Sequence, residues 1–101
     1  MKIAIPSEGN TLDAQIDSRF GRCAFFAIYD TDTRKTDFFP NSAKDSSEGA
    51  GPAAVKFIAS KGVKTIVAAE FGGKVKPLLD KLQIEMINEN GKNISKIIQQ
   101  F

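Results

Sequence analysis

The chain has 101 residues, which suits one domain with a single core, and we expect one domain over residues 1–101. Its 42% hydrophobic and 26% charged residues are typical of a folded protein, and no apolar run approaches the roughly 18 residues of a membrane span. Its 14 basic and 12 acidic residues give a formal charge of +2, and the lysines are spread along the chain, which argues against a nucleic-acid binder.

The first predicted strand covers Ile3 to Ile5, an apolar run closed by Pro6. This run is far too short for the hydrophobic segment of a signal peptide. Residues 7–23 follow, with many Ser, Gly, Asn and Asp residues and few apolar anchors, so we expect an irregular loop there. A loop of this length in so small a domain is typically functional or mobile.

A hairpin is predicted next. Residues 24–30 and 35–40 are rich in aromatic and β-branched side chains and are separated by a polar turn. The first three strands would then form an antiparallel meander. Residues 41–51 have the Ser, Gly and charged composition of a flexible segment, and they form a second candidate functional loop.

Three helices and two strands are expected after this loop. Pro52 suits the first position of a helix over 52–61, and Gly62 suits a C-terminal cap. The apolar spacing predicts a second helix over 74–82. The apolar, β-branched run 65–69 is typical of a buried parallel strand near the centre of a sheet.

A short strand over 85–88 and a terminal helix around Ile94, Ile97 and Phe101 complete the chain. The order βββαβαβ, with a C-terminal helix, predicts an α/β fold in which helices cover a mixed sheet.

The single cysteine and the absence of histidine limit the chemistry. Cys23 alone cannot form an internal disulfide, which favours the cytoplasm. Without histidine the chain lacks the commonest metal ligand and the usual general base. A nuclease would need clustered carboxylates, one of them in the first strand, whereas that strand has none and Glu48 and Glu70 stand singly in loops. We therefore expect no enzyme activity.

Three segments carry a resemblance to a known family: IDSRFGRCAFFAIYD (16–30), GAGPAAVKFIASKGVKTIVAAEFGG (49–73) and KVKPLLDKLQIEM (74–86). They resemble the dinitrogenase iron-molybdenum cofactor biosynthesis family, which includes NifX-like proteins, the C-terminal domain of NifB-like proteins and small stand-alone homologues. The resemblance implies a ribonuclease H-like α/β fold with a five-stranded mixed sheet. It also implies a non-catalytic binding or carrier protein for an iron-sulfur or iron-molybdenum-type cofactor precursor, with metallocluster donor and acceptor proteins as partners.

The same resemblance implies a binding site made from two glycine-containing loops. Its candidate residues are Arg19, Phe20, Gly21, Arg22, Cys23, Gly49 and Gly51. In this interpretation Cys23 is the metal ligand, Arg19 and Arg22 lower its pKa and attract an anionic cluster, and backbone N–H groups at 49–51 supplement them. Because an iron-sulfur cluster ordinarily uses about four thiolates, a homodimer that pools two cysteines is one arrangement to consider.

Each of these residues also has a structural interpretation. Cys23 can be a small buried hydrophobe at the start of the second strand, and Phe20 can anchor the polar loop to the core. Arg22 and Asp17 can form a loop-closing ion pair. The glycines of EFGGK (70–74) fit a tight turn better than an anion site.

Two other functions stay open from the sequence. One is a metal-free interaction or regulatory module, which the absent histidine and single cysteine favour. The other is an RNA- or DNA-binding module, prompted by the ribonuclease H-like fold that the resemblance implies.

Overall fold

The computed structural model describes residues 1–46 and 48–101. Within this part of the chain the elements follow the predicted order, which is thereby confirmed. They are β1 (Lys2–Ser7), β2 (Phe25–Asp30), β3 (Thr36–Pro40), α1 (Ala50–Ser60), β4 (Val63–Ala68), α2 (Val75–Lys81), β5 (Glu85–Asn88) and α3 (Ile94–Ile98). The expected flexible segment 41–51 includes Ser47, which lies outside the described residues.

The five strands form one mixed sheet in the order β3-β2-β1-β4-β5. The strands β1, β2 and β3 pair antiparallel, as the predicted meander requires, whereas β4 and β5 run parallel to β1. The central strand is β1, with β4 beside it. Pro6 lies inside β1 rather than closing it, which is tolerated because the register with β4 ends at Ala4 and needs no amide from Pro6.

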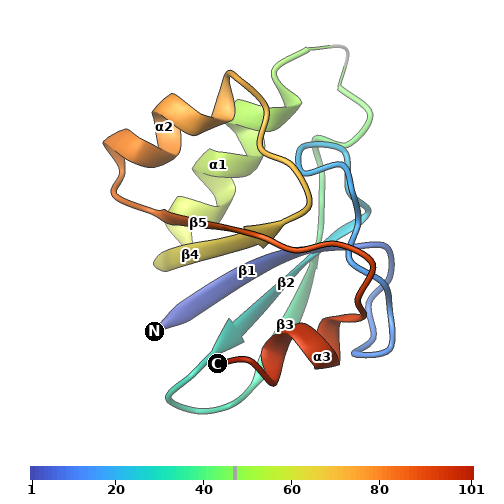
Figure 1. The fold of residues 1–101 in the computed structure, drawn as a ribbon. Coiled ribbons are helices and arrows are strands. Elements are labelled where there is room, and N and C mark those ends of the chain that lie inside the picture. Colours follow the sequence, from blue (N-terminus) through green and yellow to red (C-terminus); the bar gives the residue numbers. More distant parts are fainter. Residues whose placement is uncertain (47) are drawn as a thin grey trace.

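Helices cover both faces of the sheet (Figure 1), with α1 and α2 on one face and α3 on the other. Alternate side chains of a strand lie on opposite faces of the sheet. Ala4 therefore belongs to the core under α1 and α2, while Ile3 and Ile5 belong to the core under α3. All three are fully buried, because a central strand covered on both sides exposes neither face. This explains the uninterrupted apolar run in the sequence.

Helix α1 begins two residues earlier than predicted. Pro52 is its third residue, not its first, and the change costs little because a missing N–H is harmless anywhere in the first turn. The other end agrees with the prediction: Gly62 has φ +77° and donates its N–H to the carbonyl of Ala59 at 3.1 Å, as a glycine cap does.

The carboxyl ends of β1 and β4 lie at the same edge of the sheet, and the chain leaves them in opposite directions (Figure 1). After β1 it passes through the loop around residues 8–24 toward β2. After β4 it passes through residues 69–74 to α2 and then to β5. In open α/β sheets such a divergence leaves a crevice outside the strand ends, and this crevice is where ligands commonly bind.

Candidate functional site

A pocket of about 670 Å³ occupies this crevice. Three chain segments line it: the loop after β1, the start of α1, and the turn from β4 into α2. Its lining residues are Ser18, Arg19, Phe20, Gly21, Arg22, Glu48, Gly49, Ala50, Gly51, Pro52, Glu70, Gly72, Gly73, Lys74 and Val75. We call it the strand-end pocket. Of the seven candidate residues from the sequence, all but Cys23 line it.

Two glycines let the three segments meet. A Cβ on Gly21 would lie 2.8 Å from the amide nitrogen of Gly51 and 2.9 Å from its Cα, and a Cβ on Gly51 would lie 2.9 Å from Cγ2 of Val75. These distances are closer than non-bonded atoms approach, so a side chain at Gly21 would push the loop away from α1. Gly21 and Gly51 are therefore explained by the close approach of these segments at the pocket.

The start of α1 has backbone N–H groups with no acceptor among the described residues. Gly49 is the N-cap, in a left-handed conformation, and no side chain caps this end or places an acid in its first turn. The earliest intrahelical bond joins the amide of Ala53 to the carbonyl of Gly49 at 3.0 Å, which leaves the amides of Ala50 and Gly51 without a partner inside the helix. A helix start of this kind favours an anion.

Charged side chains at the pocket are mixed, with three basic residues against two acidic ones. Of the basic side chains, Arg22 is already engaged: its Nη1 donates to the carbonyl oxygens of Lys44, at 3.0 Å, and Ser46. It ties the segment after β3 to the loop after β1. The expected ion pair between Arg22 and Asp17 does not form, because Asp17 binds Arg19 instead.

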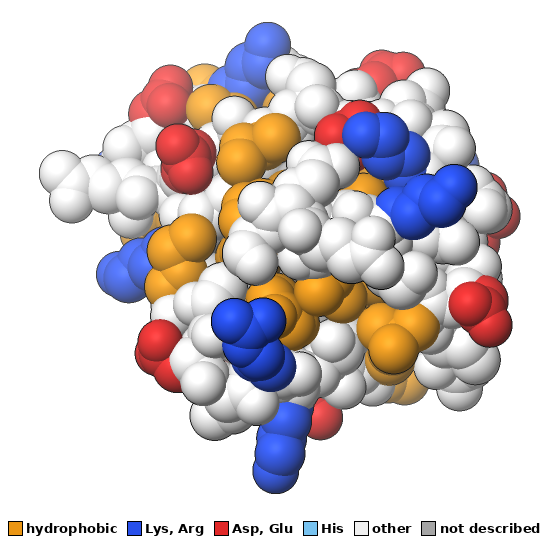
Figure 2. Space-filling model, turned by 60° about the horizontal axis from the view of Figure 1, so that its bottom comes forward, with side chains coloured by type: hydrophobic (Ala, Val, Ile, Leu, Met, Phe, Trp, Pro, Cys, Tyr) orange, Lys and Arg blue, Asp and Glu red, His pale blue; other side chains and the backbone are white. Residues whose placement is uncertain are grey.

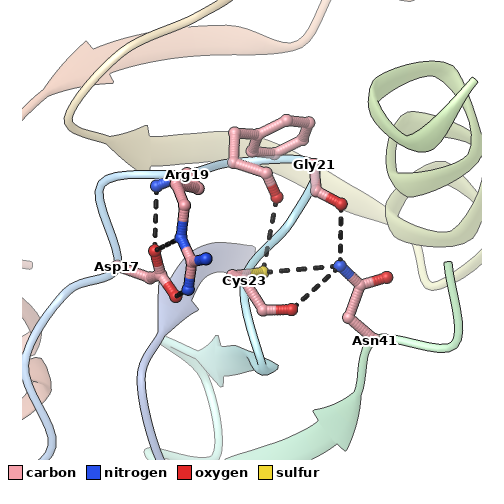
Figure 3. Close-up of polar contacts among 6 residues, drawn as sticks. Asp17, Arg19, Gly21, Cys23 and Asn41 are labelled. Atoms are coloured by element: carbon pink, nitrogen blue, oxygen red, sulfur yellow. Dashed lines mark hydrogen bonds and ion pairs between the residues drawn. The ribbon is translucent and has the colours of Figure 1, made fainter. Parts of the chain in front are cut away.

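Asp17 and Arg19 form a two-pronged pair beside the pocket (Figure 3). One carboxylate oxygen of Asp17 accepts from Nε of Arg19 and the other from Nη2, both at 3.2 Å. The first oxygen also accepts from the backbone amide of Arg19 at 2.9 Å. The hydrogen bonds and charge of Asp17 raise the pKa of Arg19 above its ordinary value, so the guanidinium stays charged.

Phe20 anchors the loop after β1, as its structural interpretation held. Its side chain is 5% exposed, and its ring centroid lies 5.9 Å from that of Phe26 and 6.2 Å from that of Phe71. It joins the core under α1 and forms part of the pocket wall.

Cys23 is fully buried and does not line the pocket. Its Sγ lies 3.3 Å from the carbonyl oxygen of Phe20 (Figure 3), to which the thiol donates. Burial, and secondarily the charge of Asp17, raise the pKa of the thiol to about 12. The expectation that Arg19 and Arg22 lower this pKa is therefore wrong: the first is paired with Asp17 and the second is turned toward Lys44.

Asn41 is a site residue that the sequence did not single out. Its side chain is buried, and Nδ2 donates to the carbonyl oxygens of Gly21 and Cys23, both at 3.0 Å, while Oδ1 accepts from the amide of Ala43 at 3.1 Å. It joins the segment after β3 to the loop after β1. An Asn after Pro40 is typical of a turn, so the sequence carried no signal for this role.

The strand-end pocket presents hydrogen-bond donors rather than a set of metal ligands among the described residues. Among residues 1–46 and 48–101, no group of three or more His, Cys, Asp or Glu side chains could hold a metal ion. Backbone amides, Arg19 and Lys74 offer hydrogen-bond donors instead. None of the helices in the described part of the chain is long and apolar enough to cross a membrane.

Comparison with known proteins gives matches over nearly the whole chain. A family model described as dinitrogenase iron-molybdenum cofactor matches residues 1–101. The apo form of the orange protein from Desulfovibrio gigas superposes with a TM-score of 0.92 at 30% identity, covering 99% of this chain and 85% of that one. A candidate NifB protein from Thermotoga, assigned to the DUF35 family, gives 0.85 at 30% identity with the same coverages.

A third structure, PH0822, superposes with a TM-score of 0.84 at 20% identity, over 100% of this chain and 89% of that one, and shows the shared fold alone. A search of curated protein sequences gives no significant match.

Proposed function

Because this chain belongs to the dinitrogenase iron-molybdenum cofactor family, we propose that it is a non-catalytic binding or carrier protein for an anionic iron-sulfur or iron-molybdenum-type cofactor precursor. The precursor is cargo and would sit in the strand-end pocket. Its partners would be proteins that donate and accept the cluster. We place the protein in the cytoplasm on the strength of its one free cysteine.

One observation carries the proposal: the loop after β1 and the start of α1, which bear the family's glycines, meet at the pocket. Six candidate binding residues thus surround one cavity, namely Arg19, Phe20, Gly21, Arg22, Gly49 and Gly51. The amides at the start of α1, which have no acceptor among the described residues, and the positive charges of Arg19 and Lys74 would attract a negatively charged cargo.

The donor set does not fit a cluster ligated by cysteines of one chain. Cys23 is the only cysteine, and its buried thiol is protonated at neutral pH, whereas thiolates are the form that binds metals. Ligation by Cys23, alone or pooled in a homodimer, would require the loop after β1 to open. We therefore propose that an assembled cluster, carrying its own sulfide, is held by charge and hydrogen bonds.

The strand order and directions support placing the domain in the ribonuclease H-like class. A nuclease reaction does not follow from that class. The central strand β1 carries no acidic residue. The acidic residues that line the pocket are Glu48 and Glu70, and these two alone would have to supply all the carboxylates of a nuclease metal site.

An anaerobic titration with tetrathiomolybdate, followed by visible absorption and equilibrium dialysis, tests the proposal. Ferrous iron with sulfide serves as a second probe. We expect retained colour and metal, weakened by Lys74→Gln and left unchanged by Lys64→Gln, an exposed lysine outside the pocket. Binding should survive Cys23→Ser. A colourless, metal-free protein under all these conditions would refute the proposal.

The lack of a ligand set favours one alternative, a metal-free interaction module. Capture of the same protein partner by wild type and by Cys23→Ser, with no metal bound to either, would support it. Nucleic-acid binding is less favoured: among the described residues of the face in Figure 2, Lys and Arg side chains stand singly or in pairs among acidic ones and form no continuous basic stripe.

A further inference from the structure

We propose that Asp17 is a positioning residue that fixes the orientation of the Arg19 guanidinium. In this orientation the free N–H edge of Arg19 faces the strand-end pocket and binds an anion that has two acceptor atoms on one side. The inference rests on the proposed function in taking this pocket as the binding site. It adds the shape of the anion that the pocket would bind, and it identifies the residue that orients Arg19 before binding.

The hydrogen-bond pattern of Arg19 supports this assignment. A guanidinium has five N–H groups, and Asp17 takes one from Nε and one from Nη2. The adjoining edge, made by Nη1 and the remaining hydrogen of Nη2, has no acceptor among the described residues. This edge matches two neighbouring oxygen or sulfur atoms of an anion.

The burial of the two side chains is unequal. The side chain of Asp17 is 3% exposed and that of Arg19 is 66% exposed. Burying a carboxylate is costly unless it is well bonded, while an exposed arginine has many rotamers to choose from. The buried carboxylate of Asp17 therefore holds the exposed side chain of Arg19 in one orientation before a ligand binds. This reduces the conformational entropy that is lost on binding.

The neighbouring cations lack this preparation. Arg22 is turned to the carbonyl oxygens of Lys44 and Ser46, so it would have to break contacts to reach a ligand. Lys74 is an exposed point charge without a planar edge. Arg19 is thus the pocket cation with a fixed orientation and a free edge.

Removing the charge of Asp17 distinguishes two explanations for its effect on anion binding, namely orientation of Arg19 and long-range electrostatic repulsion of the anion. The Asp17→Asn variant makes the neighbourhood of the pocket more positive, which by long-range attraction alone would strengthen anion binding. If Asp17 acts by orienting Arg19, the same variant weakens binding, because the amide cannot accept from both Nε and Nη2.

The experiment uses two matched dianions, molybdate and tetrathiomolybdate, which share a metal, a charge and a tetrahedral shape. Nitrogen NMR of the three arginines reports rotation of each guanidinium and its response to each anion. In wild type we expect slow rotation of Arg19 and a shift of its signals on titration. Asp17→Asn should free the rotation and weaken binding about three- to tenfold, which corresponds to the net free energy of about one ordinary hydrogen bond.

Asp13→Asn, the same change at an exposed position of the same loop, is the control and should alter neither measurement. In the Arg19→Gln background, Asp17→Asn should have no further effect on binding, since the two residues act as one unit. Tighter binding by Asp17→Asn, or additive losses in the double variant, would overturn the inference.

The wild-type titration keeps the inference testable even if Asp17→Asn does not fold. A freely rotating Arg19, or Arg19 signals that neither anion shifts, would overturn it. A response to molybdate without one to tetrathiomolybdate would contradict the proposed function and leave the role of Asp17 standing.

Discussion

Gly21 carries no side chain because the backbone of α1 occupies the place where one would be. The nearest atoms, 2.8 to 3.1 Å from the position that a Cβ would take, belong to the main chain of Ala50 and Gly51, which cannot turn aside as a flexible side chain can. A substitution here must move one of the segments that form the base of the pocket.

Gly21→Ala should lower the free energy of unfolding by about 1–3 kcal/mol, the usual cost of overpacking, and should also weaken anion binding. Urea unfolding measures the first effect. The matched control is Gly72→Ala, whose Cβ would meet nothing within 4 Å and which we expect to stay within about 0.5 kcal/mol of wild type. Equal losses for both variants would contradict the packing argument.

Cys23 makes stability depend on alkaline pH. Burial raises the pKa of its thiol to about 12, so the folded protein keeps the proton after the unfolded chain has lost it near pH 9. The stabilisation is complete below pH 9 and is lost as the pH rises toward 12, by up to about 1.4 kcal/mol per pH unit.

The stability advantage of wild type over Cys23→Ala should therefore shrink between pH 8 and pH 10.5 in urea titrations, roughly in step with that slope. At pH 8, iodoacetamide should label the thiol slowly in the folded protein and rapidly in urea. Fast labelling of the folded protein would show that the thiol is accessible and would revive its role as a metal ligand.

At the residue scale, the sequence predicts a contact well only when the contact depends on residues that are close together in the chain. The structural interpretation of Phe20 as a loop anchor is confirmed, because an aromatic side chain in a polar loop commonly packs on the core. The ion pair of Asp17 with Arg22, one of two interpretations of Arg22, does not form: Asp17 binds Arg19, because the choice between two nearby arginines depends on which way the loop turns. The pKa of Cys23 reversed its expected direction because burial is a tertiary property.

At the scale of elements, the segment after β3 is tied to the loop after β1 by the side chains of Arg22 and Asn41. Asn41 provides the buried attachment and Arg22 the more exposed one. Such an arrangement allows this segment to open locally without unfolding of the sheet.

Arg22→Lys should speed hydrogen exchange about tenfold at the amides of Ala43, Lys44 and Ser46, because one ammonium cannot reproduce the contacts of the guanidinium. Global stability should change by less than about 0.5 kcal/mol. Arg34→Lys, the same change at an exposed turn, is the control and should leave these amides unaffected. Unchanged exchange in Arg22→Lys would show that Asn41 alone holds the segment.

The order of elements followed from periodicity and from glycine and proline positions, and it was confirmed along the chain. Boundaries were less secure: α1 starts at Ala50 because a proline is compatible with any position in a first turn, so Pro52 could not fix the start. Helix α3 holds its N-terminus with Asn93, whose side chain accepts from the amide of Lys96 at 2.9 Å. The capping potential of that residue was not used in the prediction.

At the scale of the whole molecule, the sheet separates two cores with different tasks. The core under α1 and α2 includes Phe20 and Val75, which also line the strand-end pocket. The core under α3 includes Ile94 and Ile97 and has no residue in that pocket. The first should therefore couple packing to binding, whereas the second should support stability alone.

Ile58→Val and Ile97→Val test this division, since both isoleucines are fully buried and lie in different cores. Each should lower the free energy of unfolding by about 0.5–1.5 kcal/mol. Because they belong to separate hydrophobic clusters, the double variant should lose the sum of the two within about 0.5 kcal/mol. Ile97→Val should bind tetrathiomolybdate as wild type does. A coupling above about 1 kcal/mol, or weakened binding by Ile97→Val, would mean that the sheet transmits packing changes between its faces.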